Sequence, residues 1–130
     1  MAETQIQVLL VEDEVLLREL LVEPLEEAGF AVRIATSGDE AIAILERDGE
    51  AIRGVVTDVN LGGKVTGWHV GHHARKVNSQ MPVVYTTAQS AEDWAAHGVP
   101  NSVHIIKPFA AVQVVTAISH LLNTRSSPPT

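Results

Sequence analysis

The stretch Ile6-Gln7-Val8-Leu9-Leu10-Val11 is a short apolar run that leads directly into two acids, Glu12 and Asp13. A run of this length, rich in aliphatic residues, predicts a buried strand. Across residues 14–28 the apolar positions instead recur at helical spacing, and Gly29 follows as a natural stop. This part of the sequence therefore predicts one strand followed by one helix, with acids at the end of the strand.

The same alternation continues along the rest of the chain. Further strands are predicted over 30–35, 54–58, 82–87 and 103–106, and further helices over 37–48, 67–77, 90–97 and 109–122. Five strands that alternate with five helices predict an α/β domain with a doubly wound parallel sheet and helices on both faces. Strands that are nearly all apolar fit this fold, because helices cover both their sides. We expect one domain over 1–123 and a disordered, polar, proline-rich tail over 124–130.

The composition narrows the classes of function. The 130 residues are 45% hydrophobic, have a net charge of −7 and include no cysteine. This composition excludes a disulfide scaffold, a thiol nucleophile and a cysteine-built zinc site. The acidic balance argues against non-specific nucleic-acid binding, which needs basic residues to neutralise phosphates. With no apolar run of about 18 residues and a polar segment over 1–7, we expect a cytoplasmic protein with no membrane partner.

Polar residues of complementary kinds follow four of the five predicted strands. In open parallel sheets, ligands bind beyond the carboxyl ends of the strands, so these side chains should lie close together. They are Glu12 and Asp13 after the first strand, Asp58 at the end of the third, Thr86 and Thr87 at the end of the fourth, and Lys107 after the fifth. Neighbouring carboxylates repel one another, and a hard divalent cation such as Mg²⁺ relieves the repulsion. Such a site is suited to accepting a phosphoryl group.

Each of these residues also has an ordinary structural explanation. Asp13 could cap the first helix, and Lys107-Pro108 could open the last one. Residues 58–60 could form a turn, and Thr86 and Thr87 could simply favour a strand. All four explanations would have to hold together, each at its own strand end, so the phosphoryl-accepting site is the preferred interpretation.

Three histidines, His69, His72 and His73, recur at helical spacing and could share a metal ion. No acid or further histidine lies close to them in sequence, so we interpret them as part of an exposed helix face. Trp68 and Trp94 are expected in core or partner contacts.

Four stretches carry a resemblance to the receiver domain of response regulators in two-component signalling. They are VLLVEDE at 8–14, VVTDVNL at 55–61, PVVYTTA at 82–88 and IIKPF at 105–109. They follow the family's order at nearly its spacing, and the resemblance covers residues 6–123. It implies the flavodoxin-like strand order 2-1-3-4-5 found in a chemotaxis receiver.

The resemblance also implies a role for each residue of the site. Asp58 corresponds to the phosphoacceptor and Thr87 to the switch hydroxyl. Lys107 corresponds to the family's lysine, and its bond to Pro108 is expected to be cis. The implied Mg²⁺ ligands are Glu12, Asp13, Asp58 and the backbone carbonyl of Asn60.

Two features depart from the family pattern. His104 stands where an aromatic switch residue is usual, and a histidine can also gain a charge. The loop over 60–67 lacks the usual proline and is about one residue longer than the commonest form, which favours flexibility. The two positions that line the approach to the phosphoacceptor in this family are Asn60 and Gln89. Both are amides able to hold a water, so we expect them to tune dephosphorylation.

The functional prediction is a single-domain response regulator. A histidine kinase or a histidine phosphotransfer protein would phosphorylate Asp58 and thereby switch protein contacts through Thr87 and His104. The downstream partner is expected to dock on the face made by the fourth helix, fifth strand and fifth helix, which could also support a homodimer. We expect no direct nucleic-acid partner and no enzymatic role beyond slow self-dephosphorylation.

Two alternatives from other classes stay open. One is a small Mg²⁺-dependent aspartyl-phosphate phosphohydrolase. Such enzymes need a second acid two residues after the nucleophile, and the amide of Asn60 cannot serve as one. The other is a receiver-like module that binds partners without phosphorylation, against which the intact Asp58, Thr87 and Lys107 argue.

Overall fold

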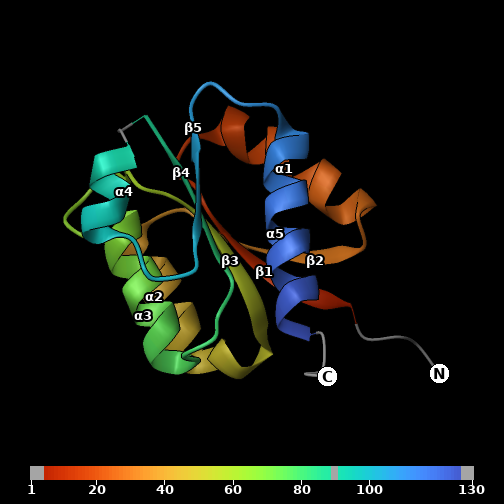
Figure 1. Ribbon diagram of the computed structural model, residues 1–130, viewed down its shortest axis with the longest axis horizontal. Helices are drawn as coiled ribbons and strands as arrows, with labels where there is room; N and C mark the ends of the chain where they lie inside the picture. The colour runs from red at the N-terminus through yellow and green to blue at the C-terminus, as the bar shows by residue number, and fades with distance from the viewer. Residues whose placement is uncertain (1–4, 89–90, 127–130) are drawn as a thin grey trace.

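A computed structural model describes residues 5–88 and 91–126, with the side chains of residues 125 and 126 left out. Strands and helices alternate along the chain, as Figure 1 shows. In order they are β1 (Ile6–Val11), α1 (Val15–Glu27), β2 (Phe30–Ala35), α2 (Gly38–Asp48), a short 3-10 turn (Gly49–Ala51), β3 (Ile52–Asp58), α3 (Gly67–Val77), β4 (Val83–Thr87), α4 (Ala91–His97), β5 (Val103–Ile106) and α5 (Ala111–Ser126).

The five strands form one sheet in the order β2-β1-β3-β4-β5, and every neighbouring pair is parallel. This arrangement confirms the predicted doubly wound sheet and its strand order. The register pairs Val11 with Thr57 and Asp58 with Thr86. The carboxyl ends of β1, β3 and β4 therefore lie level with one another at a single edge of the sheet.

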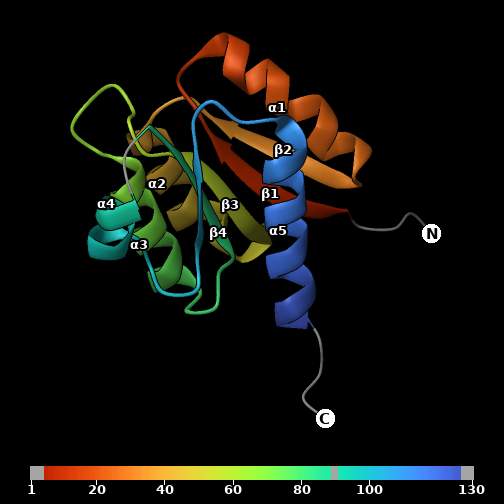
Figure 2. The ribbon, with the colours of Figure 1, turned by 45° about the horizontal axis from the view of Figure 1, so that its top comes forward.

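Alternate residues of each buried strand pack into two different cores, one on each face of the sheet. On β1, Leu9 and Val11 face the core under α2 and α3, while Val8 and Leu10 face the core under α1 and α5. Figure 2 shows these two pairs of helices on opposite sides of the sheet. Because side chains alternate along a strand, a strand covered on both sides must be apolar at nearly every position.

The bounds predicted from the sequence agree closely with the structure at α2 and less closely at α5. Ser37 caps α2, since its hydroxyl accepts from the backbone N–H of Glu40 at 3.0 Å. Helix α5 begins at Ala111 rather than at 109 and runs through Ser126, so residues 124–126 are helical where a tail was expected. No glycine or proline interrupts residues 111–126, and nothing there ends the helix. Residues 127–130 lie outside the described part of the chain.

Among the described residues, no helix is long and apolar enough to cross a membrane.

Candidate functional site

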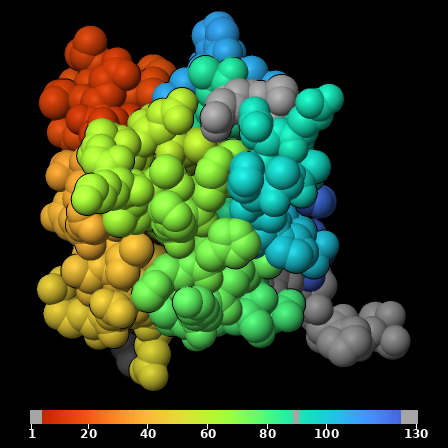
Figure 3. All heavy atoms as spheres, turned by 90° about the vertical axis from the view of Figure 1, so that its left-hand side faces the viewer, coloured from red at the N-terminus to blue at the C-terminus, as the bar shows by residue number. Residues whose placement is uncertain are grey.

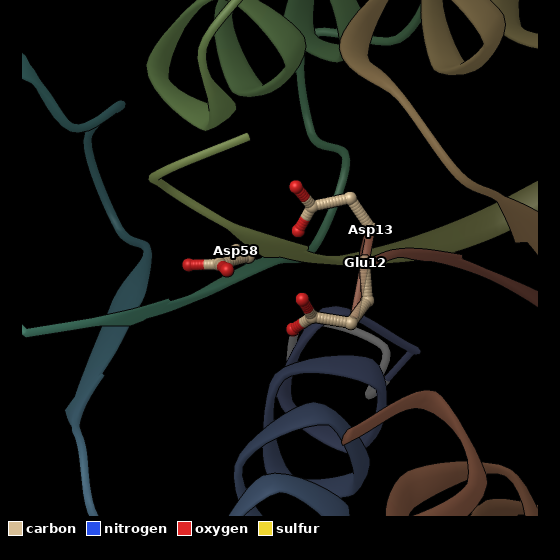
Figure 4. A group of neighbouring side chains, drawn as sticks. All are labelled: Glu12, Asp13 and Asp58. Atoms are coloured by element: carbon tan, nitrogen blue, oxygen red, sulfur yellow. The ribbon is translucent and has the colours of Figure 1, made fainter. Parts of the chain in front are cut away.

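Three carboxylates gather at the level edge of the sheet. Glu12 and Asp13 follow β1, Asp58 ends β3, and one oxygen from each lies within 4.8 Å of the others. Figure 4 shows Glu12 and Asp13 extending from the end of β1 toward the edge occupied by Asp58. The parallel register brings these residues together although 45 positions separate Asp13 from Asp58 (58 − 13). The structure thus forms the acidic cluster that the strand ends predicted.

Glu12 is the buried member of this cluster, with only 1% of its surface exposed. Burial, and after it the nearby charge of Asp58, raises the pKa of its carboxyl from 4.5 to about 7. The Glu14 backbone N–H, which donates to Oε2 at 3.2 Å, and the Lys107 charge lower the pKa in part. Glu12 therefore holds a proton unusually well in the absence of a cation.

Asp13 is exposed and connects two segments of the site. Its Oδ2 accepts from the backbone N–H of Gly62 at 3.1 Å, so it ties the end of β1 to the loop between β3 and α3. The cap position of α1 is Glu14, which makes no side-chain capping bond. Asp13 is therefore not a helix cap, and this alternative for its role is excluded.

Asp58 is nearly buried, with 4% of its surface exposed, and both its oxygens have partners. Its Oδ2 accepts from Lys107 Nζ at 2.9 Å, and its Oδ1 accepts from the backbone N–H of Asn60 at 3.2 Å. The Lys107 N–H in turn donates to the Thr87 carbonyl at 2.8 Å, and the following bond to Pro108 is cis as expected. These contacts fix a lysine and a carboxylate face to face at the edge of the sheet.

Lys107-Pro108 does not open α5. The helix begins three residues after Pro108, at Ala111, and the side-chain oxygen of Gln113 accepts from the backbone N–H of Ala110 at 2.8 Å. The segment between β5 and α5 thus serves to position Lys107 rather than to start the helix.

The predicted switch residues lie on neighbouring strands. Thr87 is fully buried at the end of β4, and β5 places His104 opposite Tyr85. The His104 ring stacks on Trp94 of α4, with centroids 4.4 Å apart and planes 25° apart. The Trp94 indole N–H also donates to Ser102 Oγ at 2.9 Å. His104 is therefore packed against α4, a contact that the sequence did not reveal. Gln89, the other predicted tuning position, lies outside the described residues.

A glycine controls how closely α3 approaches the site, and sequence reasoning missed it. A Cβ at Gly67 would collide with the carbonyl oxygen of Asp58 and lie 2.7 Å from the Cα of Val59. The Gly67 N–H donates to the Val59 carbonyl at 2.9 Å. Only a residue without a side chain fits here, so a glycine opening a helix just after an acidic strand end was the available signal.

The three histidines of α3 do not form a metal site. His69 Nδ1 accepts from the backbone N–H of Thr66 at 3.0 Å, His72 Nε2 lies 2.8 Å from the carbonyl of His97, and His73 Nε2 lies 3.7 Å from Glu46. Within the described residues, the group that could hold a metal is Glu12, Asp13 and Asp58. The histidines belong to a helix face, as predicted.

Comparison with known proteins agrees with this geometry. The family model of the response regulator receiver domain matches residues 8–119, and the chain belongs to that family. A response regulator receiver protein from Sinorhizobium medicae WSM419 has a solved structure that is 41% identical, with a TM-score of 0.89. The match covers 94% of this chain and 98% of that one. The chemotaxis protein CheY4 of Vibrio cholerae is 22% identical with a TM-score of 0.79, covering 91% and 99% of the two chains, which shows the shared fold.

Among curated proteins, the chain is similar to parts of longer ones. It is 32% identical over 118 residues to the sensor kinase CckA of Brucella abortus, which covers 88% of this chain and 12% of that protein. It is 28% identical to the transcriptional regulatory protein CusR of Escherichia coli, covering 89% of this chain and 51% of that protein. The chain thus spans about half or less of these relatives. Receiver domains act in two-component signalling as phosphoacceptor switches, and they bind Mg²⁺ at an acidic pocket that corresponds here to Glu12, Asp13 and Asp58.

Proposed function

We propose that this chain is a response regulator receiver that accepts a phosphoryl group from a phosphohistidine onto Asp58. The observation that carries the proposal is the environment of the Asp58 carboxylate. It is nearly buried, it contacts the Lys107 ammonium at 2.9 Å, and it lies within 4.8 Å of the Glu12 and Asp13 carboxylates. A carboxylate in this setting is held in place as a nucleophile with positive charge beside it.

In the proposed step, an Asp58 oxygen forms a bond to phosphorus as the bond between phosphorus and the histidine nitrogen breaks. The bonding electron pair returns to the imidazole, which leaves as neutral histidine once it is protonated. The Lys107 ammonium already contacts Asp58 Oδ2, so it is positioned to offset the charge that develops on the phosphoryl oxygens. The backbone N–H of Asn60 fixes the other oxygen at 3.2 Å and so orients the carboxylate.

The donor set fits Mg²⁺. Its oxygens are hard anionic ligands. Burial, and after it the charge of Asp58, raises the pKa of Glu12, so the ionised carboxylates are held unfavourably close and a cation beside them would stabilise the charged form. We propose that Glu12, Asp13, Asp58 and the carbonyl of Asn60 hold the ion. When bound, Mg²⁺ would neutralise charge on the carboxylates and on the incoming phosphoryl group.

An apolar rim beside the acidic edge suits docking of the phosphohistidine protein. Four large side chains at the start of α1 and α5 are exposed: Val15 by 55%, Leu16 by 74%, Leu20 by 47% and Val112 by 65%. Large apolar side chains exposed together on a protein surface are typical of sites that bind another protein. We propose that a histidine kinase or histidine phosphotransfer protein docks here and presents its phosphohistidine to Asp58.

The switch itself is also part of this proposal. Phosphorylation would act through Thr87, at the end of β4, and through His104, whose ring lies against Trp94 of α4. The contact supports an output face on α4, β5 and α5 for a downstream protein or a second copy. Tuning of the phosphorylated lifetime by Asn60 and Gln89, the absence of direct nucleic-acid binding and a cytoplasmic location remain predictions from the sequence.

Labelling by a small phosphodonor tests the proposal. With acetyl phosphate and Mg²⁺, the parent protein should incorporate one phosphoryl group, and a chelator should prevent it. Asp58→Asn should abolish labelling, while the matched variant Asp39→Asn, which alters an exposed acid on α2, should label normally. Undiminished labelling of Asp58→Asn would refute the assignment. No labelling of the parent would favour the phosphorylation-independent module, and multiple turnover of a phosphate monoester would favour the phosphohydrolase.

A second pair of variants tests the docking rim separately. Leu16→Glu should slow transfer from a phosphorylated histidine phosphotransfer protein but leave labelling by acetyl phosphate unchanged, because it alters docking and not the site. Val77→Glu changes an exposed apolar residue at the far end of α3 and serves as the control. Equal transfer rates in Leu16→Glu and the control would contradict the proposed docking of the phosphohistidine protein on this apolar rim.

A further inference from the structure

A groove of about 390 Å³ lies between α2 and α3, away from the acidic site. Its apolar part is formed by Ile42 and Val65, and its other lining residues are Lys64, Lys76 and the three histidines of α3. Figure 3 shows the face of the molecule on which α2, in orange, and α3, in green, lie beside each other. The groove therefore combines apolar and basic side chains.

The basic character of this groove stands out in an acidic chain. The net charge is −7, and the sequence contains only three lysines. Lys107 belongs to the phosphoacceptor site, and both of the others, Lys64 and Lys76, line the groove. Among the described residues that line it there is no acid. Glu46, on α2, approaches His73 to 3.7 Å from outside that lining.

Helix α1 carries a surface with the opposite character. Leu16 and Leu20 are exposed by 74% and 47%, and Glu19 and Glu23 are exposed on the same stripe of the helix. Four glutamates lie within α1, and its one basic residue, Arg18, donates back to the carbonyl of Glu12 at 2.9 Å. The exposed surface of α1 thus carries two leucines with two glutamates beside them.

These two surfaces cannot meet within one molecule, because α1 covers one face of the sheet and α3 covers the other (Figure 2). We propose that they meet between molecules: the Leu16–Leu20 stripe of one copy docks in the α2–α3 groove of a second copy, with Glu19 and Glu23 facing Lys64 and Lys76. An amphipathic helix laid into an apolar groove is a common mode of protein recognition. The charges of Glu19 and Glu23 beside these leucines would select this partner and set its direction.

The geometry of the contact determines how the association should behave. The two surfaces differ, so the contact is head-to-tail and leaves a free α1 and a free groove at the ends of each assembly. The groove is small, so the association should be weak and transient. Because exposed charges contribute to it, added salt should weaken it.

Sedimentation equilibrium of the full chain tests the proposal. At low ionic strength, the average mass should exceed the 14.0 kDa of one chain as the protein concentration rises from about 10 μM to about 1 mM, and should fall back toward it in high salt. A mass that stays at one chain across this range would overturn the proposal, whatever the outcome of phosphorylation experiments.

Reversing the charges in the groove or on α1 tests whether these two surfaces form the contact. The groove variant, with Lys64→Glu and Lys76→Glu, and the helix variant, with Glu19→Lys and Glu23→Lys, should each remain monomeric alone. An equimolar mixture should associate again, because each contact then pairs opposite charges. A control with Arg47→Glu and Arg53→Glu has the same net charge as the groove variant but should associate like the parent. Circular dichroism confirms folding of each variant. Association that survives in both single-surface variants, or that does not return in the mixture, would refute the proposed contact.

Discussion

Replacing Glu12 by glutamine should make the protein more stable when Mg²⁺ is absent, although it removes a residue of the site. Glu12 is buried beside Asp58, within the 4.8 Å cluster, and its pKa is raised to about 7 by burial and by that neighbouring charge. Two unit charges at this separation repel by about 3 kcal/mol at an effective dielectric constant of about 20. Solvent at the open edge and partial protonation reduce the gain from the substitution to about 1–2 kcal/mol. For a domain of this size that corresponds to a rise in melting temperature of about 4–8 °C.

The effect of this substitution should depend on pH in a defined direction. A carboxyl whose pKa is raised on folding does not destabilise the protein below its unfolded pKa of 4.5, and it destabilises it increasingly as pH rises through about 7. The stability that Glu12→Gln gains over the parent should therefore be largest near pH 8 and small near pH 5. Glutamine can still accept the N–H of Glu14, so the local backbone should be kept. Glu50→Gln, which alters an exposed acid of the 3-10 turn, is the matched control.

Thermal melts with and without Mg²⁺ separate the two roles of Glu12. At pH 8, saturating Mg²⁺ should raise the melting temperature of the parent more than that of Glu12→Gln, because binding stabilises only the state that holds the ion. A variant less stable than the parent at pH 8 without Mg²⁺ would refute the electrostatic reasoning. An equal rise with Mg²⁺ in both proteins would refute the role of Glu12 in holding the ion.

Two further predictions concern the aromatic residues behind the site. A Cβ at Gly71 would collide with the hydroxyl of buried Tyr85, so Gly71→Ala should lower the free energy of unfolding by about 1–3 kcal/mol in a urea titration, and an unchanged value would contradict that packing. In Trp68→Phe the remaining fluorescence comes from Trp94, which stacks on His104, so its emission should change on phosphorylation with Mg²⁺. Identical spectra before and after phosphorylation would contradict a role for His104 in the switch.

The elements that carry the site could be predicted from sequence because their signals are local. Apolar runs that end in polar residues gave the strands, and parallel pairing then required those ends to share one edge. Glu12, Asp13, Asp58 and Lys107 accordingly lie together as expected. The true end of α5 could not be found in the same way, because no proline or glycine marks it within residues 111–126.

The contacts that orient the site depend on tertiary packing and were not visible in the sequence. The bond from Gly62 to Asp13 joins residues 49 positions apart, one in the loop before α3 and the other just after β1. The stacking of His104 on Trp94 requires α4 to lie along β5. Patterns of spacing define which face a residue occupies, but they do not define which side chain of another element it meets.

Reductive trapping of the phosphorylated protein tests the central claim most directly. Borohydride reduces an aspartyl phosphate to homoserine, and peptide mass spectrometry then locates the altered residue. After treatment with acetyl phosphate and Mg²⁺, position 58 should be converted and no other acid should be, including Glu12 and Asp13. Conversion at another position, or phosphate incorporation without conversion at Asp58, would contradict the account.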